Sequence, residues 1–471
     1  MRMLTRTVVA LSAAALAAAC TETPLDPSPS EFQPSFARVG SLSGAASATT
    51  KFFVVSLAGA LPESFADAVA EAGATVDALY ADLGVAVVSN LDDAGARNLR
   101  LIKGVGFVEQ EPMFYIDEPV SIAEAEVADV GVASPGDPTT ATRYARQWNM
   151  RAIHADDAWA AGRLGSSDVT VAILDTGIDY LYPDLVGRVD LSRSASFVPV
   201  DDADAAFYFP MRHPITDLHY HGTHVASTVA TNGLIVAGVT SGVTLIGAKV
   251  CSWLGGCPGS SVYAGIVHAV LMGADVANMS LGGSFSKRDF PGAVSAYQRL
   301  FNWAQQNGTT FVVSAGNSAF DLDHDTDGFK TYCTVANVVC VSATGPIASA
   351  GVNGPWTELD AATGYTNFGR SAISVAAPGG TSPGAVWAAC STSSLAIPQC
   401  QRGVFVLGLG GTSMAAPHVS GVAALIAEDV GRDPAQIRAR LQQSADDLGQ
   451  LGTDPFYGKG RVNAAAAVGV N

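Results

Sequence analysis

The stretch Val169-Thr170-Val171-Ala172-Ile173-Leu174, followed at once by Asp175-Thr176-Gly177-Ile178-Asp179, indicates the fold of this chain. Six apolar or β-branched residues in a row are typical of a strand that is buried on both faces, as in a parallel sheet. Similar runs alternate with helical patterns along the rest of the chain, at residues 245–250, 276–280, 310–314, 338–342 and 373–376. This alternation predicts an α/β domain whose mostly parallel sheet carries helices on both faces.

Three short polar motifs lie in this region. Asp175 ends the first strand, where a carboxylate can hold an imidazole in one tautomer. His221 begins His221-Gly222-Thr223-His224, which runs into a helix of small residues. Ser413 lies in Gly411-Thr412-Ser413-Met414-Ala415, where small neighbours expose a hydroxyl at a helix N-terminus and the helix dipole favours negative charge on a substrate. Because ligands bind at the carboxyl ends of parallel strands, the motifs indicate a catalytic site there.

In their chain order, Asp175, His221 and Ser413 resemble the triad of the subtilisin-like serine peptidases, the subtilases. Chymotrypsin-like enzymes place histidine before aspartate, and α/β-hydrolases place serine before the acid and the histidine. The resemblance covers about residues 144–468. It implies a serine endopeptidase (EC 3.4.21 class) that hydrolyses protein or peptide substrates through an acyl-enzyme and needs no cofactor for catalysis.

The resemblance also implies roles for single residues. Ser413 would attack the scissile carbonyl, His221 would accept and return the proton, and Asp175 would orient the imidazole. Asn317 matches the asparagine whose side chain stabilises the oxyanion. Two segments would pair with the substrate and line the pocket for the residue before the cut bond, the P1 residue: Ser280, Leu281 and Gly282, and Ser314, Ala315 and Gly316. A pocket bounded by small residues favours large apolar P1 side chains, within a broad specificity.

Two other functions fit parts of the sequence. An exported binding or scaffold protein could keep this fold without activity, but it would need the loss of a triad residue, and none is missing. A serine esterase or lipase on another fold is opposed by the chain order. His224 and His418 are interpreted as packed, hydrogen-bonded histidines, because no glutamate follows His221 as in zinc-binding H-E-x-x-H motifs.

Charge and length limit the partners of the chain. The 471 residues include 43 acidic and 26 basic ones, for a formal net charge of -17, which would repel a phosphate backbone. We therefore expect no nucleic-acid partner, and we expect the enzyme to act as a monomer.

Residues 1–20 have the order of a secretory signal, because Arg2 and Arg6 precede an apolar run that small residues end. The run covers residues 8–19 and is shorter than the roughly 20 residues of a membrane-spanning helix. The pattern predicts export to the extracellular space or the periplasm. Cys20 leaves two interpretations open: it is lipidated and anchors the protein to a membrane, or ordinary cleavage leaves it as a spare thiol.

Residues 21–50 are rich in Ser, Pro, Thr and Ala and indicate a disordered linker. Residues 51–116 then predict the order β-α-β-β-α-β of a small ferredoxin-like domain. This domain resembles the inhibitor-type propeptides of subtilases, which implies a precursor that cuts itself and is first folded and inhibited by its own propeptide. Residues 117–142 indicate an exposed acidic linker with the processing site, between Asp117 and Ala145, and residues 143–471 form the catalytic domain.

Apart from Cys20, six cysteines fall into three sequence-local couples: Cys251 with Cys257, Cys333 with Cys340, and Cys390 with Cys400. Since an exported chain can oxidise its thiols, we expect a disulfide within each couple. An acidic string suggests a calcium site, with Asp321, Asp323, Asp325 and Asp327 as candidate ligands. It lacks the glutamate of an EF-hand, so a merely solvated acidic loop is the alternative.

Overall fold

The computed structural model describes residues 50–116, 119–127, 130–283, 285–325 and 327–470. The predicted signal peptide, Cys20 and the predicted first linker lie outside these residues, except for residue 50. No helix within the described ranges has both the length and the apolar character that crossing a membrane requires.

The N-terminal domain has the predicted element order. It comprises β1 (Lys51–Ser56), α1 (Phe65–Glu71), β2 (Thr75–Tyr80), β3 (Val85–Ser89), α2 (Asp93–Arg100) and β4 (Val105–Gln110). The strands form an antiparallel sheet in the order β2-β3-β1-β4. Side chains alternate across each strand, so Val54 and Val88 pack on the two helices while Phe53 and Val87 face the larger domain.

The larger domain is built on one sheet with the strand order β19-β16-β14-β11-β7-β9-β8, with β20 also paired to β16. Every pair is parallel except β16 with β19. Its strands are β7 (Thr170–Asp175), β8 (Ala195–Ser196), β9 (Thr244–Lys249), β11 (Val276–Met279), β14 (Thr310–Ser314), β16 (Val338–Gly345), β19 (Ala361–Ala362) and β20 (Val375–Pro378). The predicted α/β fold class is confirmed.

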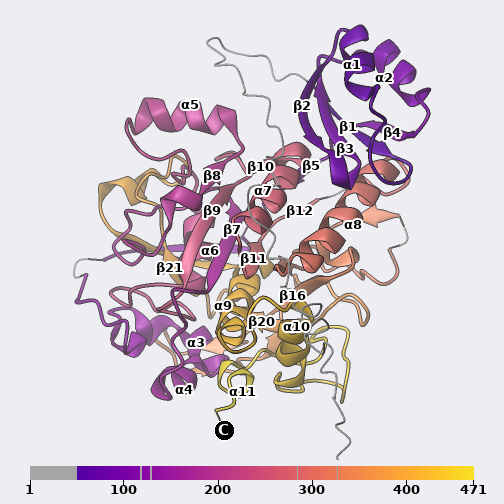
Figure 1. Cartoon of the computed structure of the whole chain (residues 1–471). Helices are drawn as coiled ribbons and strands as arrows, with labels where there is room; N and C mark the ends of the chain where they lie inside the picture. Colours follow the sequence, from indigo (N-terminus) through magenta and orange to yellow (C-terminus); the bar gives the residue numbers. More distant parts are fainter. Residues whose placement is uncertain (1–49, 117–118, 128–129, 284, 326, 471) are drawn as a thin grey trace, which may run out of the picture.

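Helices cover both faces of this sheet (Figure 1). Val171 and Ile173 of β7 belong to the core shared with α6 (His221–Val229) and α9 (Thr412–Val430), and Ala172 and Leu174 belong to the core shared with α7 (Gly259–Leu271) and α8 (Pro291–Gln306). The N-terminal domain rests on α7 and α8 (Figure 1). The remaining helices are α3 (Trp148–Ala152), α4 (Ala155–Ala160), α5 (Pro199–Tyr208), α10 (Pro434–Gln443) and α11 (Ala464–Ala467).

The segment that follows the N-terminal domain contains two strands. β5 (Met113–Tyr115) lies between β10 (Gly256–Pro258) and β12 (Gly282–Gly283), antiparallel to both. β6 (Ser121–Glu126) pairs with β22 (Phe405–Gly410), which also pairs with β21 (Val386–Ala389). The exposed linker predicted over residues 117–142 therefore contains a strand, which the acidic composition concealed. Further short strands are β13 (Phe285–Ser286), β15 (Gly328–Phe329), β17 (Ala348–Ser349) and β18 (Trp356–Thr357).

Three disulfides close short surface loops, between Cys251 and Cys257, Cys333 and Cys340, and Cys390 and Cys400. These are the three sequence-local pairs expected from the cysteine spacing. All six cysteines are buried.

Candidate active site

Asp175 and His221 form a buried pair at the carboxyl end of the sheet. Asp175 is the last residue of β7, and His221 is the first residue of α6. The Oδ1 atom of Asp175 lies 2.8 Å from His221 Nδ1 and accepts a second hydrogen bond of 2.8 Å from the Thr176 N–H. With Nδ1–H donating to the carboxylate, Nε2 is the basic nitrogen of the imidazole. The pair is thus arranged to take a proton through Nε2.

Asp217, which sequence reasoning missed, holds the segments that carry this pair. Its carboxylate accepts hydrogen bonds from Thr176 Oγ1 at 2.9 Å and from the N–H and Oγ1 of Thr223 at 2.9 and 2.6 Å. Thr176 follows Asp175, and Thr223 lies in the first turn of α6. Gly222 lets the start of α6 approach the segment after β7 closely, because a Cβ atom at Gly222 would lie only 2.1 Å from the Gly177 carbonyl oxygen. In the sequence, Asp217 is a single aspartate four residues before His221. Single aspartates are common, so the sequence does not predict this role.

Ser413 lies in the first turn of α9, which packs on α6 and on strands β11, β14 and β16. Its backbone carbonyl accepts a 2.9 Å hydrogen bond from Ser280 Oγ, and its own Oγ lies 3.4 Å from the Ser280 carbonyl oxygen. Ser280 Oγ in turn accepts from the Asn278 side chain at 3.0 Å. The end of β11 therefore fixes the start of α9, and with it the position of the Ser413 hydroxyl.

Asn317 presents an amide group beside this helix start. Its Oδ1 accepts hydrogen bonds from the N–H and Oγ1 of Thr412, at 2.8 and 2.9 Å. Its buried Nδ2 has no hydrogen-bond partner among the described residues, and a Cβ atom on Gly411 would lie 3.1 Å from it. Thr412, which was not predicted from the sequence, accepts the Gly316 N–H at 3.0 Å and so links Asn317 and Gly316 to the start of α9. An orphan buried donor of this kind fits an oxyanion site.

Replacing Asn317 by alanine should lower kcat by about 100-fold to 1000-fold, because a donor to the developing oxyanion is lost while substrate binding is kept. KM for a peptide substrate should change little. Steady-state kinetics would test this, with Asn307→Ala as the matched control at the exposed end of α8. A loss confined to KM would contradict the assignment.

The two predicted substrate-binding segments lie at neighbouring strand ends. Ser280, Leu281 and Gly282 follow β11, while Ser314 ends β14 and continues into Ala315 and Gly316. β11 and β14 are parallel neighbours, so both segments lie at the carboxyl edge of the sheet. Part of the chain itself occupies the first segment, since Tyr115 of β5 pairs with Gly282 and the Ile116 N–H donates to the Gly255 carbonyl at 3.1 Å. An extended peptide therefore fits between β10 and β12.

The four aspartates of the acidic string do not converge on a common point among the residues that the structure describes. Asp321 accepts from His324 Nδ1 at 2.7 Å, and Asp323 accepts the Ser371 N–H at 2.9 Å. Asp325 and Asp327 accept backbone N–H groups of Gly328 and Arg288, respectively. Each carboxylate thus serves a different protein donor, and the part of the chain that the structure describes contains no convergent group of three acidic, histidine or cysteine ligands. A structural calcium ion stays a prediction, and these four residues do not fit it.

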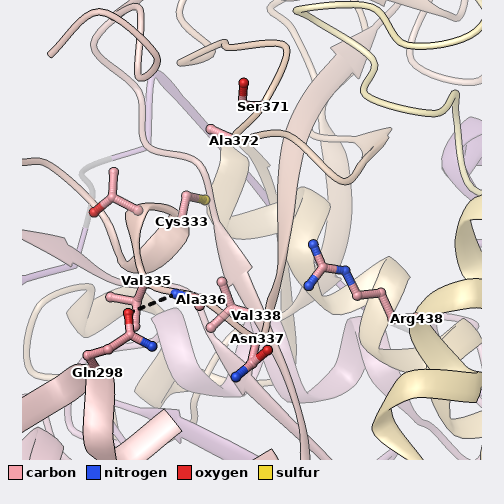
Figure 2. Close-up of a pocket in the computed structure, with 10 residues that line it drawn as sticks. Gln298, Cys333, Val335, Ala336, Asn337, Val338, Ser371, Ala372 and Arg438 are labelled. Atoms are coloured by element: carbon pink, nitrogen blue, oxygen red, sulfur yellow. Dashed lines mark hydrogen bonds between the residues drawn. The ribbon is translucent and has the colours of Figure 1, made fainter. Parts of the chain in front are cut away.

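A surface pocket of about 410 Å³ has none of the catalytic candidates in its lining. Figure 2 shows the Arg438 side chain at one side of it and Gln298, which accepts the Ala336 N–H at 3.2 Å, at the other. Of the site residues and cysteines predicted from the sequence, only Cys333 lines this pocket. The lining therefore includes neither the three triad candidates nor Asn317.

Three buried histidines surround the site without taking part in the Asp175–His221 pair. Burial lowers the pKa of His219 and of His224 to about 3 and that of His418 to about 4. His224 Nε2 lies 3.1 Å from the Val386 carbonyl oxygen, and His418 Nδ1 lies 2.7 Å from that of Met414. His224 and His418 are packed, hydrogen-bonded residues, as predicted.

Two buried aspartates have pKa values shifted in the opposite sense. Burial raises the pKa of Asp184 and of Asp217 to about 6, although hydrogen bonds to each favour the ionised form. Asp184 accepts the N–H groups of Leu234, Ile235 and Val236, and Asp217 accepts those described above.

These five groups predict that the free energy of unfolding falls as pH decreases from about 6.5 to about 4. Each buried histidine stays neutral in the folded state while the unfolded chain binds its proton, a loss of about 1.4 kcal/mol per pH unit. Between pH 6 and 4, Asp184 and Asp217 are protonated in the folded state but remain ionised in the unfolded chain. Their proton uptake stabilises the folded state as the pH falls, and it offsets the destabilisation from two of the three histidines. For these five groups together, the loss should be about 1.4 kcal/mol per pH unit between pH 6 and 4. Urea unfolding of a Ser413→Ala variant at several pH values would measure it, and constant stability across this range would contradict it.

The comparisons with known proteins agree on one family. The model of the subtilase family (Peptidase S8) matches residues 166–460. Thermitase of Thermoactinomyces vulgaris is 30% identical over 338 residues, which cover 71% of this chain and 99% of thermitase. Subtilisin E of Bacillus subtilis (strain 168) is 32% identical over 352 residues, covering 72% of this chain and 76% of the relative.

Solved structures share the fold. Fervidolysin from Fervidobacterium pennivorans, a keratinolytic enzyme related to subtilisin, superposes with a TM-score of 0.66 at 24% identity, covering 91% of this chain and 62% of fervidolysin. The epidermin leader peptide processing serine protease of Staphylococcus aureus gives a TM-score of 0.67 at 20% identity, covering 89% and 98%. At these identities the likeness concerns the fold.

Proposed function

This chain belongs to the subtilase family and is a serine endopeptidase, and from this premise we propose that Ser413, His221 and Asp175 perform its peptide-bond hydrolysis. Ser413 Oγ attacks the scissile carbonyl as His221 Nε2 takes its proton. The Asn317 amide and the Ser413 N–H stabilise the oxyanion. His221 then protonates the leaving amine as the C–N bond breaks, and a water molecule hydrolyses the acyl-enzyme by the same steps. The observation that carries this proposal is the 2.8 Å contact between Asp175 and His221 at the carboxyl end of β7.

Covalent labelling tests the proposed nucleophile directly. A fluorophosphonate probe should modify the purified protein, and peptide mapping should place the modification on Ser413. The labelled protein should also lose its ability to clear casein. Casein hydrolysis by a protein that the probe modifies elsewhere would contradict the assignment, and an inactive scaffold would neither bind the probe nor clear casein.

We further propose that the protein is exported as a precursor and that residues 51–116 are its inhibitory propeptide. Two carboxylates of this domain lie at helix N-termini of the larger domain. Glu109 accepts the N–H groups of Gly292 and Ala293 in α8, at 2.8 and 3.0 Å, and Glu111 accepts that of Ser260 in α7 at 2.8 Å. Negative charge is favourable at both places because of the helix dipole. These contacts, and β5 between β10 and β12, support an inhibitory role.

Neutralising the two carboxylates should weaken this inhibition. Added domain 51–116 carrying Glu109→Gln and Glu111→Gln should inhibit the processed enzyme with an inhibition constant about tenfold or more above that of the unchanged domain, because three charge-assisted hydrogen bonds lose their charge. Glu63→Gln is the matched control, since Glu63 is exposed in the same domain. Equal inhibition by all three forms would contradict the docking role.

The finer features of the resemblance are proposals of the same kind. We propose a preference for large apolar P1 residues, which a series of peptide substrates differing only at P1 would test. Export rests on the sequence of residues 1–20 and agrees with the three disulfides. Lipidation of Cys20 would appear as incorporation of a labelled fatty acid that Cys20→Ser abolishes.

A further inference from the structure

A loop closed by a disulfide packs against the segment that leads to His221. The loop joins β21 to β22, and its disulfide links Cys390 to Cys400, which are 10 positions apart. Two serines of this loop, Ser391 and Ser394, are fully buried. Buried hydroxyl groups need hydrogen-bond partners, and both serines find theirs just before His221.

Three consecutive carbonyl groups, two to four residues before His221, each accept one hydrogen bond from the loop. The three pairs, donor first, are Ser391 Oγ with Asp217 at 2.6 Å, Leu395 N–H with Leu218 at 2.7 Å, and Ser394 Oγ with His219. Residues 217–219 belong to no helix or strand. The loop therefore supplies the backbone partners that regular secondary structure would otherwise supply, and it sets the path of the chain into His221.

The same loop also holds the segment that follows Asp175. Thr392 donates to Asp179 Oδ2 through its N–H at 2.7 Å and through its Oγ1 at 2.6 Å. Asp179 lies four residues after Asp175, and its N–H donates to Thr223 Oγ1 in α6 at 3.0 Å. One loop thus contacts both segments that carry the Asp175–His221 pair, and it fixes the position of one segment relative to the other.

The loop itself has a firm base. It grows out of the paired strands β21 and β22, and β21 packs against α6 (Figure 1). The Cys390 N–H donates to the Phe405 carbonyl at 3.0 Å, and the Ile397 N–H donates to Ser394 Oγ at 2.8 Å. The disulfide closes the loop and restricts the other conformations that it could adopt.

We propose that loop 390–400 is a positioning element for the catalytic pair, with Ser391, Thr392 and Ser394 as its positioning residues. The proposal rests on the proposed function of Asp175 and His221, because the three residues act through the segments that carry this pair. Proton transfer to His221 depends on geometry, and a displacement of about 1 Å can lower turnover by about 100-fold.

Two serine substitutions test the proposal. Ser391→Ala and Ser394→Ala each remove the donor to one carbonyl, and each should lower kcat for a peptide p-nitroanilide by about tenfold. The double variant should lower kcat by about 100-fold and leave KM within about twofold. Ser393→Ala is the matched control, because Ser393 is equally buried in the same loop but accepts a hydrogen bond of 2.7 Å from the Arg212 guanidinium instead. It should keep kcat within about twofold of the unchanged protein.

The kinetic comparison needs equal samples. Each variant is made in the full chain, and mass analysis establishes that the same processed form is assayed. Circular dichroism measures the folded fraction, and kcat is expressed per folded molecule. If the double variant does not fold, the two single variants decide by the same criteria. Replacing Cys390 and Cys400 together by alanine is an independent test that keeps the serines, and it should lower kcat at least about tenfold.

A spectroscopic measurement separates positioning from turnover. In the Ser413→Ala chain, the proton between His221 Nδ1 and Asp175 should give a resonance far downfield in the proton NMR spectrum, because a strong hydrogen bond to a carboxylate deshields it. Adding the two serine substitutions should shift or broaden this resonance, whereas adding Ser393→Ala should leave it unchanged.

Three results would overturn the proposal: equal kcat in the double variant and in Ser393→Ala, a loss confined to KM, or a lower kcat with an unchanged downfield resonance. Failure of the proposed function would look different. The unchanged protein would then neither clear casein nor react with a fluorophosphonate at Ser413, while the resonance would still report whether the loop positions His221.

Discussion

The Ser413→Ala variant should remain a single uncut chain. Its kcat should be about a million-fold lower than that of the unchanged protein, because the group proposed to form the acyl-enzyme is missing. The magnitude is that found for subtilisin itself when its nucleophile is removed, and we apply it to this relative. Residual hydrolysis would come from the oxyanion donors and from substrate binding. Single-turnover assays with a peptide substrate, together with mass analysis of the purified chain, would measure both effects.

Whether the Ser413→Ala chain is cut distinguishes self-cleavage from cleavage by other proteases. The unchanged protein should yield two fragments that separate between Asp117 and Ala145. Ser444→Ala, a change far from the site at the end of α10, should be processed normally. If purified Ser413→Ala is cut at the same bond, self-processing is wrong.

Asp175→Asn should lower kcat by about ten-thousand-fold with little change in KM. Asparagine is nearly isosteric, but its amide can donate to His221 Nδ1 and so favour the tautomer in which Nε2 carries the proton and cannot act as a base. The carboxylate's stabilisation of the imidazolium is lost as well. Steady-state measurement of kcat and KM for a peptide substrate would test this.

Asp168→Asn is the control for this change, because Asp168 is exposed just before β7. It should leave kcat unchanged. A loss in Asp175→Asn that appears only in KM, or one that a falling folded fraction explains, would assign Asp175 a structural role alone.

The sequence alone predicts much of this molecule because its signals are local. The run ending at Asp175 is a strand whichever neighbours it has, since buried parallel strands need continuous apolar residues. The elements between Lys51 and Gln110 are likewise marked by alternation and by caps such as Asp92, whose carboxylate accepts the Gly95 N–H at 2.6 Å. The fold class and the order of the catalytic candidates follow from such signals.

What the sequence could not predict depends on tertiary contacts. Asp217 matters because it meets Thr176, which lies 41 positions earlier in the chain, and Thr412 because it meets Asn317. The strand β6 could not be predicted because its acidic residues suggest a solvated segment, whereas its backbone pairs with β22. The carboxylates of the acidic string pointed to a cation, but each finds a donor of its own in the fold.

The aromatic contact between the two domains has a consequence for solubility. Phe53 lies 5.8 Å from Tyr263 and 6.2 Å from Tyr297, ring centre to ring centre, and Tyr80 lies 4.8 Å from Tyr263. Departure of the N-terminal domain would turn the faces of Tyr263 and Tyr297 toward water and leave an adhesive patch on α7 and α8. The excess of acidic over basic residues in the larger domain supplies the long-range repulsion that keeps such patches apart at low ionic strength. The processed enzyme should therefore be less tolerant of concentrated salt than its precursor, and colloidal stability becomes a property that maturation changes.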